Sequence, residues 1–305
     1  MTAPSVDPQS PTAAPVVVGI DGSRAGGLAV RWAAETAAAA GRRLRIVHAA
    51  DLTAAHILLD PYELPMASVT DAMHTFSADC LAAARQQAQA IDPALIIETE
   101  VVDGTPAQVL INETDTAHLT AVGALGLSGG GLFGSTVLAV AAYAHGQVVI
   151  VRDCGSEQPT RHLGPVVVGI DESEYSRTAL AAAFAEANQR DAELVVVHCW
   201  SDLRFDWFAG LPDVLADRTA QADAQELISA QLTGWTEKYP EVPVVRNIYV
   251  AGPSHHLIEW SKSAQLVVVG NRGRGGFPGL QLGSTSNAVI QCAHCPVMVV
   301  HPRSG

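Results

Sequence analysis

Short apolar runs alternate along the chain with longer, alanine-rich segments whose apolar residues recur at helical spacing. In the first half the runs lie at about 15–20, 44–49, 95–102, 119–123 and 147–151 and are rich in valine and isoleucine. Runs that are apolar on both faces are typical of strands in a parallel sheet covered on both sides. The intervening segments, about 24–40, 66–90, 106–116 and 135–145, predict helices. This alternation predicts an α/β fold with a doubly wound parallel sheet.

The whole pattern occurs twice. The stretch Val16–Asp21 (VVVGID) returns as Val166–Asp171, and Leu44–His48 returns in similar form as Leu194–His198, each shifted by 150 residues. Such a repeat predicts two tandem domains, each with a five-stranded sheet. We expect a disordered tail over 1–14, a first domain over 15–151, a polar linker over 152–164 and a second domain over 165–302.

Charge and composition narrow the class of partner. The chain has 305 residues, a formal net charge of −13 and only two lysines, Lys238 and Lys262. Without a basic patch, nucleic acid is not an expected partner. The apolar runs fall short of the roughly 18 residues needed to cross a bilayer, and the first residues lack a signal-peptide pattern. We therefore expect a cytoplasmic protein without membrane association. The five cysteines, an odd number, argue against a disulfide framework.

Two glycine-rich loops are the strongest candidates for chemistry. Each follows an apolar run as Gly-x-x-Gly and ends in Gly-Ser-Thr at a predicted helix start. Glycines let the backbone approach a ligand closely, and the first N–H groups and positive dipole end of a helix favour phosphate. The loops comprise Gly123, Gly126, Gly134, Ser135 and Thr136 in the first half, and Gly270, Gly273, Gly283, Ser284 and Thr285 in the second.

Asp21 and Asp171 leave the first strand of each half, whereas the glycine loops leave the fourth. Ligands of doubly wound sheets bind at the carboxyl ends of the strands, where the strand order reverses. If the first and fourth strands are neighbours at that reversal, the aspartate and the glycine loop border one pocket.

Other motifs are weaker. The stretch 129–134 is formally G-x-G-x-x-G with Asp153 downstream, a dinucleotide fingerprint, but its first glycine lies several residues beyond the strand. Cys292 and Cys295 form one C-x-x-C pair, which supplies only half of the ligands of a zinc site. The pair falls at the end of a predicted helix, so we interpret both cysteines as buried structural residues. No Walker-type lysine motif or clustered general base is present.

The glycine spacing in 270–284, the Val-Gly-Ile-Asp171 strand and the final Cys-Pro-Val-Met-Val-Val strand together resemble the universal stress protein family. The resemblance covers both halves and is to tandem, ATP-binding members of the mycobacterial type. It implies an adenine nucleotide alpha hydrolase-like, Rossmann-like fold, with ATP as the ligand and Mg²⁺ as a candidate accompanying ion.

The resemblance implies a role for each matching residue. The strand aspartates meet ribose or adenine, the backbone of Ala49 and Cys199 touches adenine, and the glycine loops hold ribose and phosphates. Beyond these and the loop residues above, the candidate binding residues are Gly19, Gly169, Asp202, Asn271, Arg272, Arg274, Gly275 and Gly276. Asn271 stands where the family usually has serine.

The resemblance implies a nucleotide-responsive regulator of stress adaptation or growth and not an enzyme. It also implies pairing through the last strands, either between the two halves or between two chains; a homodimer is expected, and an unidentified protein is a further candidate partner. The alternatives are a slow ATPase and a scaffold with vestigial pockets. The first half departs from the pattern, because seven residues separate Gly126 from Gly134 and nine separate Gly273 from Gly283. Its loop also lacks a basic residue.

Overall fold

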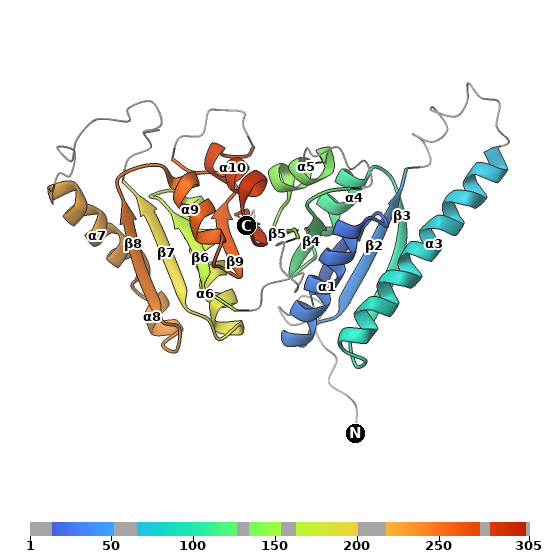
Figure 1. The fold of residues 1–305 in the computed structure, drawn as a ribbon, viewed down its shortest axis with the longest axis horizontal. Helices are drawn as coiled ribbons and strands as arrows, with labels where there is room; N and C mark the ends of the chain where they lie inside the picture. Colours follow the sequence, from blue (N-terminus) through green and yellow to red (C-terminus); the bar gives the residue numbers. More distant parts are fainter. Residues whose placement is uncertain are drawn as a thin grey trace. The chain divides into compact units, whose positions relative to one another are not determined.

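The computed structural model describes residues 14–51, 66–126, 134–153, 163–200, 218–274 and 281–302. The chain divides into two compact units, Met1–Arg152 and Asp153–Gly305, and each is described by itself (Figure 1). The predicted tail, most of the predicted linker and the loop over 127–133 lie outside the described residues.

The first unit contains a parallel sheet of five strands in the order β3-β2-β1-β4-β5. Valine-rich strands alternate with helices, as the sequence pattern predicts, which confirms the α/β class. In chain order the elements are β1 Val16–Ile20, α1 Arg24–Ala39, β2 Leu44–Ala50, α3 Met66–Ile91, β3 Ile97–Asp103, α4 Pro106–Glu113, β4 Leu119–Gly123, α5 Ser135–Tyr143 and β5 Gln147–Val151.

The second unit repeats this arrangement, with the parallel order β10-β9-β6-β7-β8. The short helix α8 has no counterpart in the first unit. The elements are β6 Val166–Ile170, α6 Glu174–Gln189, β7 Leu194–Cys199, α7 Arg218–Leu232, α8 Trp235–Lys238, β8 Val244–Tyr249, α9 Pro253–Ser261, β9 Leu266–Gly270, α10 Ser284–Cys292 and β10 Val297–Val300.

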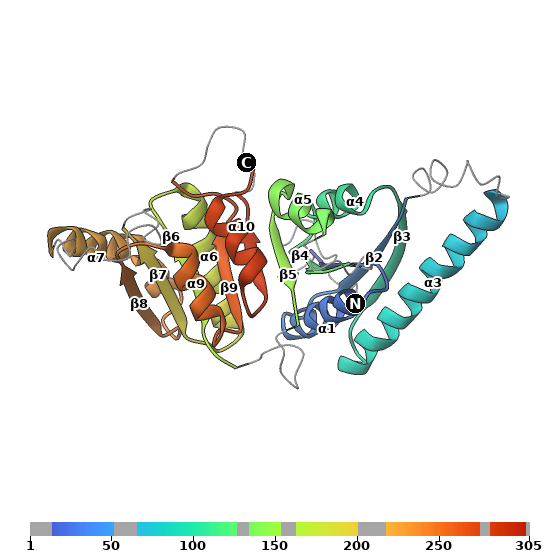
Figure 2. The same ribbon diagram turned by 45° about the horizontal axis from the view of Figure 1, so that its top comes forward.

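Helices cover both faces of each sheet. In the first unit α1 and α3 pack together over one face, and α4 and α5 pack together over the other (Figure 2). Three side chains of the central strand β1 are fully buried: Val16, Val17 and Val18. An all-apolar strand is therefore stabilised on both faces by the hydrophobic effect. No helix in the described part of the chain is long and apolar enough to span a membrane.

The position of the central strand decides where a ligand can bind. β1 lies between β2 and β4, and β6 lies between β7 and β9, so the strand order reverses beside each of them. The expected neighbourhood of first and fourth strands is therefore correct. Three residues separate each central strand from the helix that follows it, α1 or α6. The last of the three is Ser23 or Ser173, whose side chain accepts a hydrogen bond from a backbone N–H of the first helical turn and fixes the helix start.

Candidate functional site

In both units the aspartate after the central strand meets the second glycine of the loop. A Cβ placed on Gly273 would lie 2.6 Å from Oδ2 of Asp171, and one on Gly126 would lie 3.0 Å from Oδ2 of Asp21. Only a residue without a side chain lets the loop come this close. Residues about 100 positions apart in sequence therefore form one site, in the same way in each unit.

Asp171 connects a helix start to the glycine loop. Its Oδ1 accepts hydrogen bonds from the backbone N–H of Ser173 at 2.8 Å and from the Ser173 hydroxyl at 2.5 Å. Its Oδ2 accepts from the backbone N–H of Arg274 at 2.9 Å. Gln231 of α7 donates to the Asp171 carbonyl at 2.9 Å. Hydrogen bonds to an ionised carboxylate are stronger than neutral ones, so this one side chain holds the loop at the end of β6.

The side chain of Arg274 crosses the carboxyl ends of two strands. Its Nη2 donates to the carbonyl of Cys199 at the end of β7, at 3.1 Å. Its Nη1 lies 3.4 Å from Oε1 of Glu172, next to Asp171. Among the predicted residues, the structure thus brings Asp171, Cys199 and Arg274 together.

Arg272 points to different partners. Its guanidinium carbon lies 5.9 Å from the ring centroid of Tyr175, and Nη1 lies 3.4 Å from the Tyr175 hydroxyl. Its Nη2 donates to Oε1 of Gln281. These contacts hold Arg272 between α6 and the residues that lead into α10.

The helix at the end of the loop begins without a side-chain cap. α10 starts at Ser284 after Gly283, and α5 starts at Ser135 after Gly134; neither glycine provides a capping side chain. The N–H groups of a first helical turn have no acceptor within the helix, so they are available to an anion. Ser284 and Ser135 are both exposed at these positions.

Asn271 fixes the loop mainly through its backbone. Its N–H donates to the carbonyl of Val300 at 3.0 Å, and its carbonyl accepts from the N–H of Gly283 at 2.7 Å. The N–H of Gly283 is therefore already engaged, and anion binding would fall to the following residues, Ser284 and Thr285. The Asn271 side chain is 6% exposed, and its Oδ1 is buried with no hydrogen-bond partner in the described residues.

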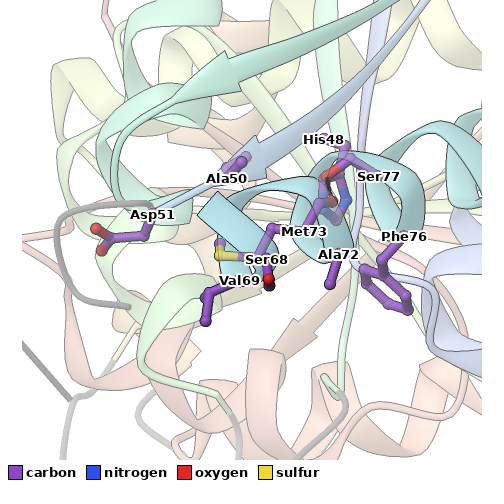
Figure 3. Close-up of a pocket in the computed structure, with 10 residues that line it drawn as sticks. His48, Ala50, Asp51, Ser68, Val69, Ala72, Met73, Phe76 and Ser77 are labelled. Atoms are coloured by element: carbon purple, nitrogen blue, oxygen red, sulfur yellow. Dashed lines mark hydrogen bonds between the residues drawn. The ribbon is translucent and has the colours of Figure 1, made fainter. Parts of the chain in front are cut away.

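The first unit has a cavity of about 510 Å³ at the end of β2, and Phe76 in its wall lies near Gly22 (Figure 3). The cavity lies between the carboxyl end of β2 and the first turns of α3, and most of its wall is apolar. Gly22, which follows Asp21, has φ +81°, and a Cβ there would lie 3.3 Å from Phe76. The cavity is lined by His48, Ala49, Ala50, Asp51, Ser68, Val69, Ala72, Met73, Phe76 and Ser77.

The family profile described as Universal stress protein family matches residues 13–152 and 163–301, which is most of both units. The chain belongs to the universal stress protein family. It is 36% identical to a universal stress protein of Mycolicibacterium smegmatis, over 97% of this chain and 99% of that protein. Identity to a universal stress protein of Mycobacterium tuberculosis is 37%, over 93% of this chain and 95% of that protein.

A universal stress protein of Archaeoglobus fulgidus has a similar solved structure, with a TM-score of 0.66. That match has 20% sequence identity and covers 97% of this chain and 100% of the other, so it shows a shared fold. The predictions of the family and of two α/β units are therefore confirmed.

Several predicted site glycines of this universal stress protein have a packing role. A Cβ on Gly19 would lie 2.6 Å from Leu110 of α4, and one on Gly169 would lie 2.8 Å from Leu257 of α9. A Cβ on Gly123 would lie 2.5 Å from the Ala25 backbone at the start of α1. These glycines allow helices to approach the strands, whereas Gly134 has nothing within 4 Å of the same point.

His48 and His198 occupy equivalent places at the ends of β2 and β7. Each ring contacts the central-strand carbonyl through Nδ1 at 3.0 Å, to Ile20 and Ile170 respectively. Burial lowers the pKa of His198, and the nearby positive charge of Arg274 lowers it further, although the hydrogen bond to Ile170 opposes the shift. Both rings therefore hold the strand ends together.

Some predictions cannot be placed. Asp202, Gly275 and Gly276 lie outside the described residues, as does most of the 129–134 fingerprint. Cys295 is fully buried, as the structural interpretation of the pair predicts, whereas Cys292 is exposed and does not fit that interpretation. Within the described ranges, no group of three or more His, Cys, Asp or Glu residues is arranged to hold a metal ion.

Sequence reasoning missed the contribution of α3 to the first site. Val69, Met73 and Phe76 line the cavity, and the ring of Phe76 lies edge-on to His48 with 5.9 Å between centroids. Their spacing of three and four residues indicates one helix face, yet the sequence does not show that this face covers the end of β2. Glu172 and Tyr175 were also missed, because only the folded loop brings arginines to them.

Proposed function

We propose that this universal stress protein binds adenine nucleotides, with ATP as the expected ligand, at the carboxyl ends of the strands in each unit. The supporting observation is the repeated pairing of an aspartate with the glycine loop, beside a helix that begins without a side-chain cap. In such an arrangement a carboxylate accepts hydrogen bonds from ribose hydroxyls or a base amine, and N–H groups meet phosphate.

The parts of ATP would lie in order along this edge. The adenine would lie beside Ala49 or Cys199 at the end of the second strand, and the ribose beside Asp21 or Asp171. The phosphates would follow the glycine loop to Ser135 and Thr136, or to Ser284 and Thr285. In the first unit the apolar wall of α3 adds a surface for a planar base, since stacking and burial of a ring stabilise binding.

Mg²⁺ fits this arrangement as an ion carried by the phosphates. Mg²⁺ is commonly bound through substrate phosphates and one or two carboxylates and keeps several waters. The Ser135, Thr136, Ser284 and Thr285 hydroxyls lie at the helix starts where the phosphates would end. The metal would shield the charge of the phosphates in a strongly acidic protein.

We propose a regulatory role in stress adaptation or growth, in which nucleotide orders the glycine loops and alters a surface for a partner or a second copy. Besides the carboxylates of Asp171 and Glu172, the groups described around the second loop are backbone N–H groups, hydroxyls and guanidinium groups, which bind phosphate. The enzyme alternative is a slow ATPase. Phosphate release over many turnovers, abolished in Asp171→Asn, would favour that alternative.

Calorimetric titration of the nucleotide-stripped protein tests the proposal by counting sites per chain. ATP, ADP and cyclic AMP are compared, with GTP as the control for the base. Two ATP sites would show that the shorter first loop still binds, and one site would assign binding to one unit. Absence of binding by any adenine nucleotide, with the circular dichroism of a folded protein, would contradict the proposal and favour a scaffold.

A further inference from the structure

The two units differ in one pair of residues at the edge of the site. In the second unit Glu172 follows the strand aspartate and Arg274 follows the second glycine, and the two side chains form an ion pair. The equivalent positions of the first unit are Gly22 and Leu127 in the sequence. The first unit therefore has neither member of the pair, although the strand order and the Asp–Gly contact are the same.

Three contacts fix Arg274 across the second site. Its backbone N–H donates to Asp171 at 2.9 Å, and its guanidinium contacts the Cys199 carbonyl at 3.1 Å and Glu172 at 3.4 Å. The side chain is only 25% exposed. A long cationic side chain is thus held over the strand ends, where a ligand of a doubly wound sheet binds.

The Cys199 carbonyl is an acceptor that a ligand would need. The pairing of β6 with β7 ends at Ile170 and His198, so Cys199 lies one residue beyond it on the β6 side, although it still pairs with Tyr249 of β8. A donor on the ligand and the guanidinium of Arg274 would compete for this carbonyl. The backbone N–H of Arg274 donates to Oδ2 of Asp171, so the Cys199 carbonyl is the acceptor that the guanidinium itself occupies before ligand binds.

We propose that Arg274 is a latch on the second site, and that it makes this site selective for phosphorylated nucleotides over nucleosides; this rests on the proposed function. A ligand must displace the guanidinium from Cys199 and Glu172. A nucleotide offers its phosphates as new partners for the displaced cation, and charge-assisted pairs of this kind are strong. A nucleoside has no phosphate, so no new contact of Arg274 compensates for the free energy lost when its guanidinium leaves Cys199 and Glu172.

Arg272 does not fulfil the same role, because its guanidinium is directed to Tyr175 and Gln281 and away from the strand ends. The first site has no cation at either position, so it is expected to prefer nucleotides over nucleosides less strongly than the second site does. The latch therefore predicts two sites with different selectivity in one chain.

The test compares ATP and adenosine binding in the full-length protein and in two variants. Arg274→Gln removes the latch and the phosphate partner together. Loss of a hydrogen bond of about 1.4 kcal/mol corresponds to about tenfold in adenosine affinity. Adenosine should therefore bind the second site about tenfold more tightly, while ATP binds more weakly. Glu172→Gln loosens the latch but keeps the cation, so both ligands should bind about two- to fivefold more tightly.

Calorimetry gives the affinities, and tryptophan fluorescence reports the second unit, since Trp200 follows Cys199 directly in the chain. Arg246→Gln is the matched control, because Arg246 contacts Ser229 on an exposed surface and should change neither ligand. Unchanged or weaker adenosine binding in Arg274→Gln, with ATP still binding the wild-type second unit, would overturn the latch. Failure of ATP to bind the wild-type second unit would instead contradict the proposed function itself.

Discussion

Replacing Gly273 with alanine tests whether the glycine loop rests on Asp171. The new Cβ would lie 2.6 Å from Oδ2 of Asp171, well inside van der Waals contact. The carboxylate has little freedom to move away, because two hydrogen bonds from Ser173 hold its other oxygen. The loop must therefore shift, and the hydrogen bond from the N–H of Arg274 to Oδ2 is lost.

The expected cost is one hydrogen bond to a charged group, about 1.5–3 kcal/mol. The bond is exposed to water, so we take the lower end, about 1.5 kcal/mol. Any Gly→Ala change also restricts the unfolded chain and stabilises by about 0.4–1 kcal/mol. Gly283→Ala shares that gain without the clash, since its nearest neighbour lies 3.4 Å away and its φ is −70°. The two variants should therefore differ by about 1.5 kcal/mol, or about 3–6 °C in melting temperature.

Urea and thermal unfolding of the ligand-free protein, followed by tryptophan fluorescence, measure this difference. Trp32 is in the first unit and the other four tryptophans follow residue 152, so the signal comes mainly from the second unit. If Gly273→Ala and Gly283→Ala agree to within about 0.5 kcal/mol, the range of ordinary surface substitutions, the contact with Asp171 does not stabilise the loop.

Two further predictions concern the strands behind the site. Gly169→Ala forces a methyl group against Leu257, which is 1% exposed. The substitution should lower the free energy of unfolding of the second unit by about 1–3 kcal/mol, measured in urea. The ATP affinity of the folded protein should stay unchanged. Weaker ATP binding at unchanged stability would instead make Gly169 a ligand contact. Burial lowers the pKa of His198 below 6.5, so the unfolded chain binds a proton more readily than the folded protein. The resulting stability is fully present above about pH 6.5 and is lost as the pH falls toward the folded pKa. His198→Gln should flatten this dependence, measured as the free energy of unfolding between pH 7.5 and 5, relative to the control His74→Gln at an exposed position. An unchanged slope would contradict the assignment.

Much of the fold follows from the sequence because strand and helix periods are local properties. The buried valine runs at 16–20 and 166–170 and the serine caps at Ser23 and Ser173 set the elements almost to the residue. The predicted helix over 106–116 was too long. It ends at Glu113, because the hydroxyl of Thr114 donates to the carbonyl of Ile111 and the chain turns there.

The site was only partly predictable, because it depends on contacts between residues that lie far apart in the sequence. The sequence indicated Asp171 and Gly273 separately, and the strand order brings them together. It did not show that Arg274 turns back to the Cys199 carbonyl, nor that Phe76 lies beside Gly22. Glycines such as Gly19 were assigned to a ligand, since sequence alone does not distinguish close approach of a ligand from close approach of a helix.

The hydrogen bond between Gly283 and Asn271 ties the two ends of the second loop together. The number of residues between them can therefore change with little effect on the stability of the rest of the fold. Lengthening this intervening segment from the nine residues 125–133 of the first half to the eleven residues 272–282 of the second costs only about 0.2 kcal/mol in closure entropy. After duplication, each copy was free to alter the length and charge of this segment. The same tolerance makes the segment a practical place to graft new ligand preferences.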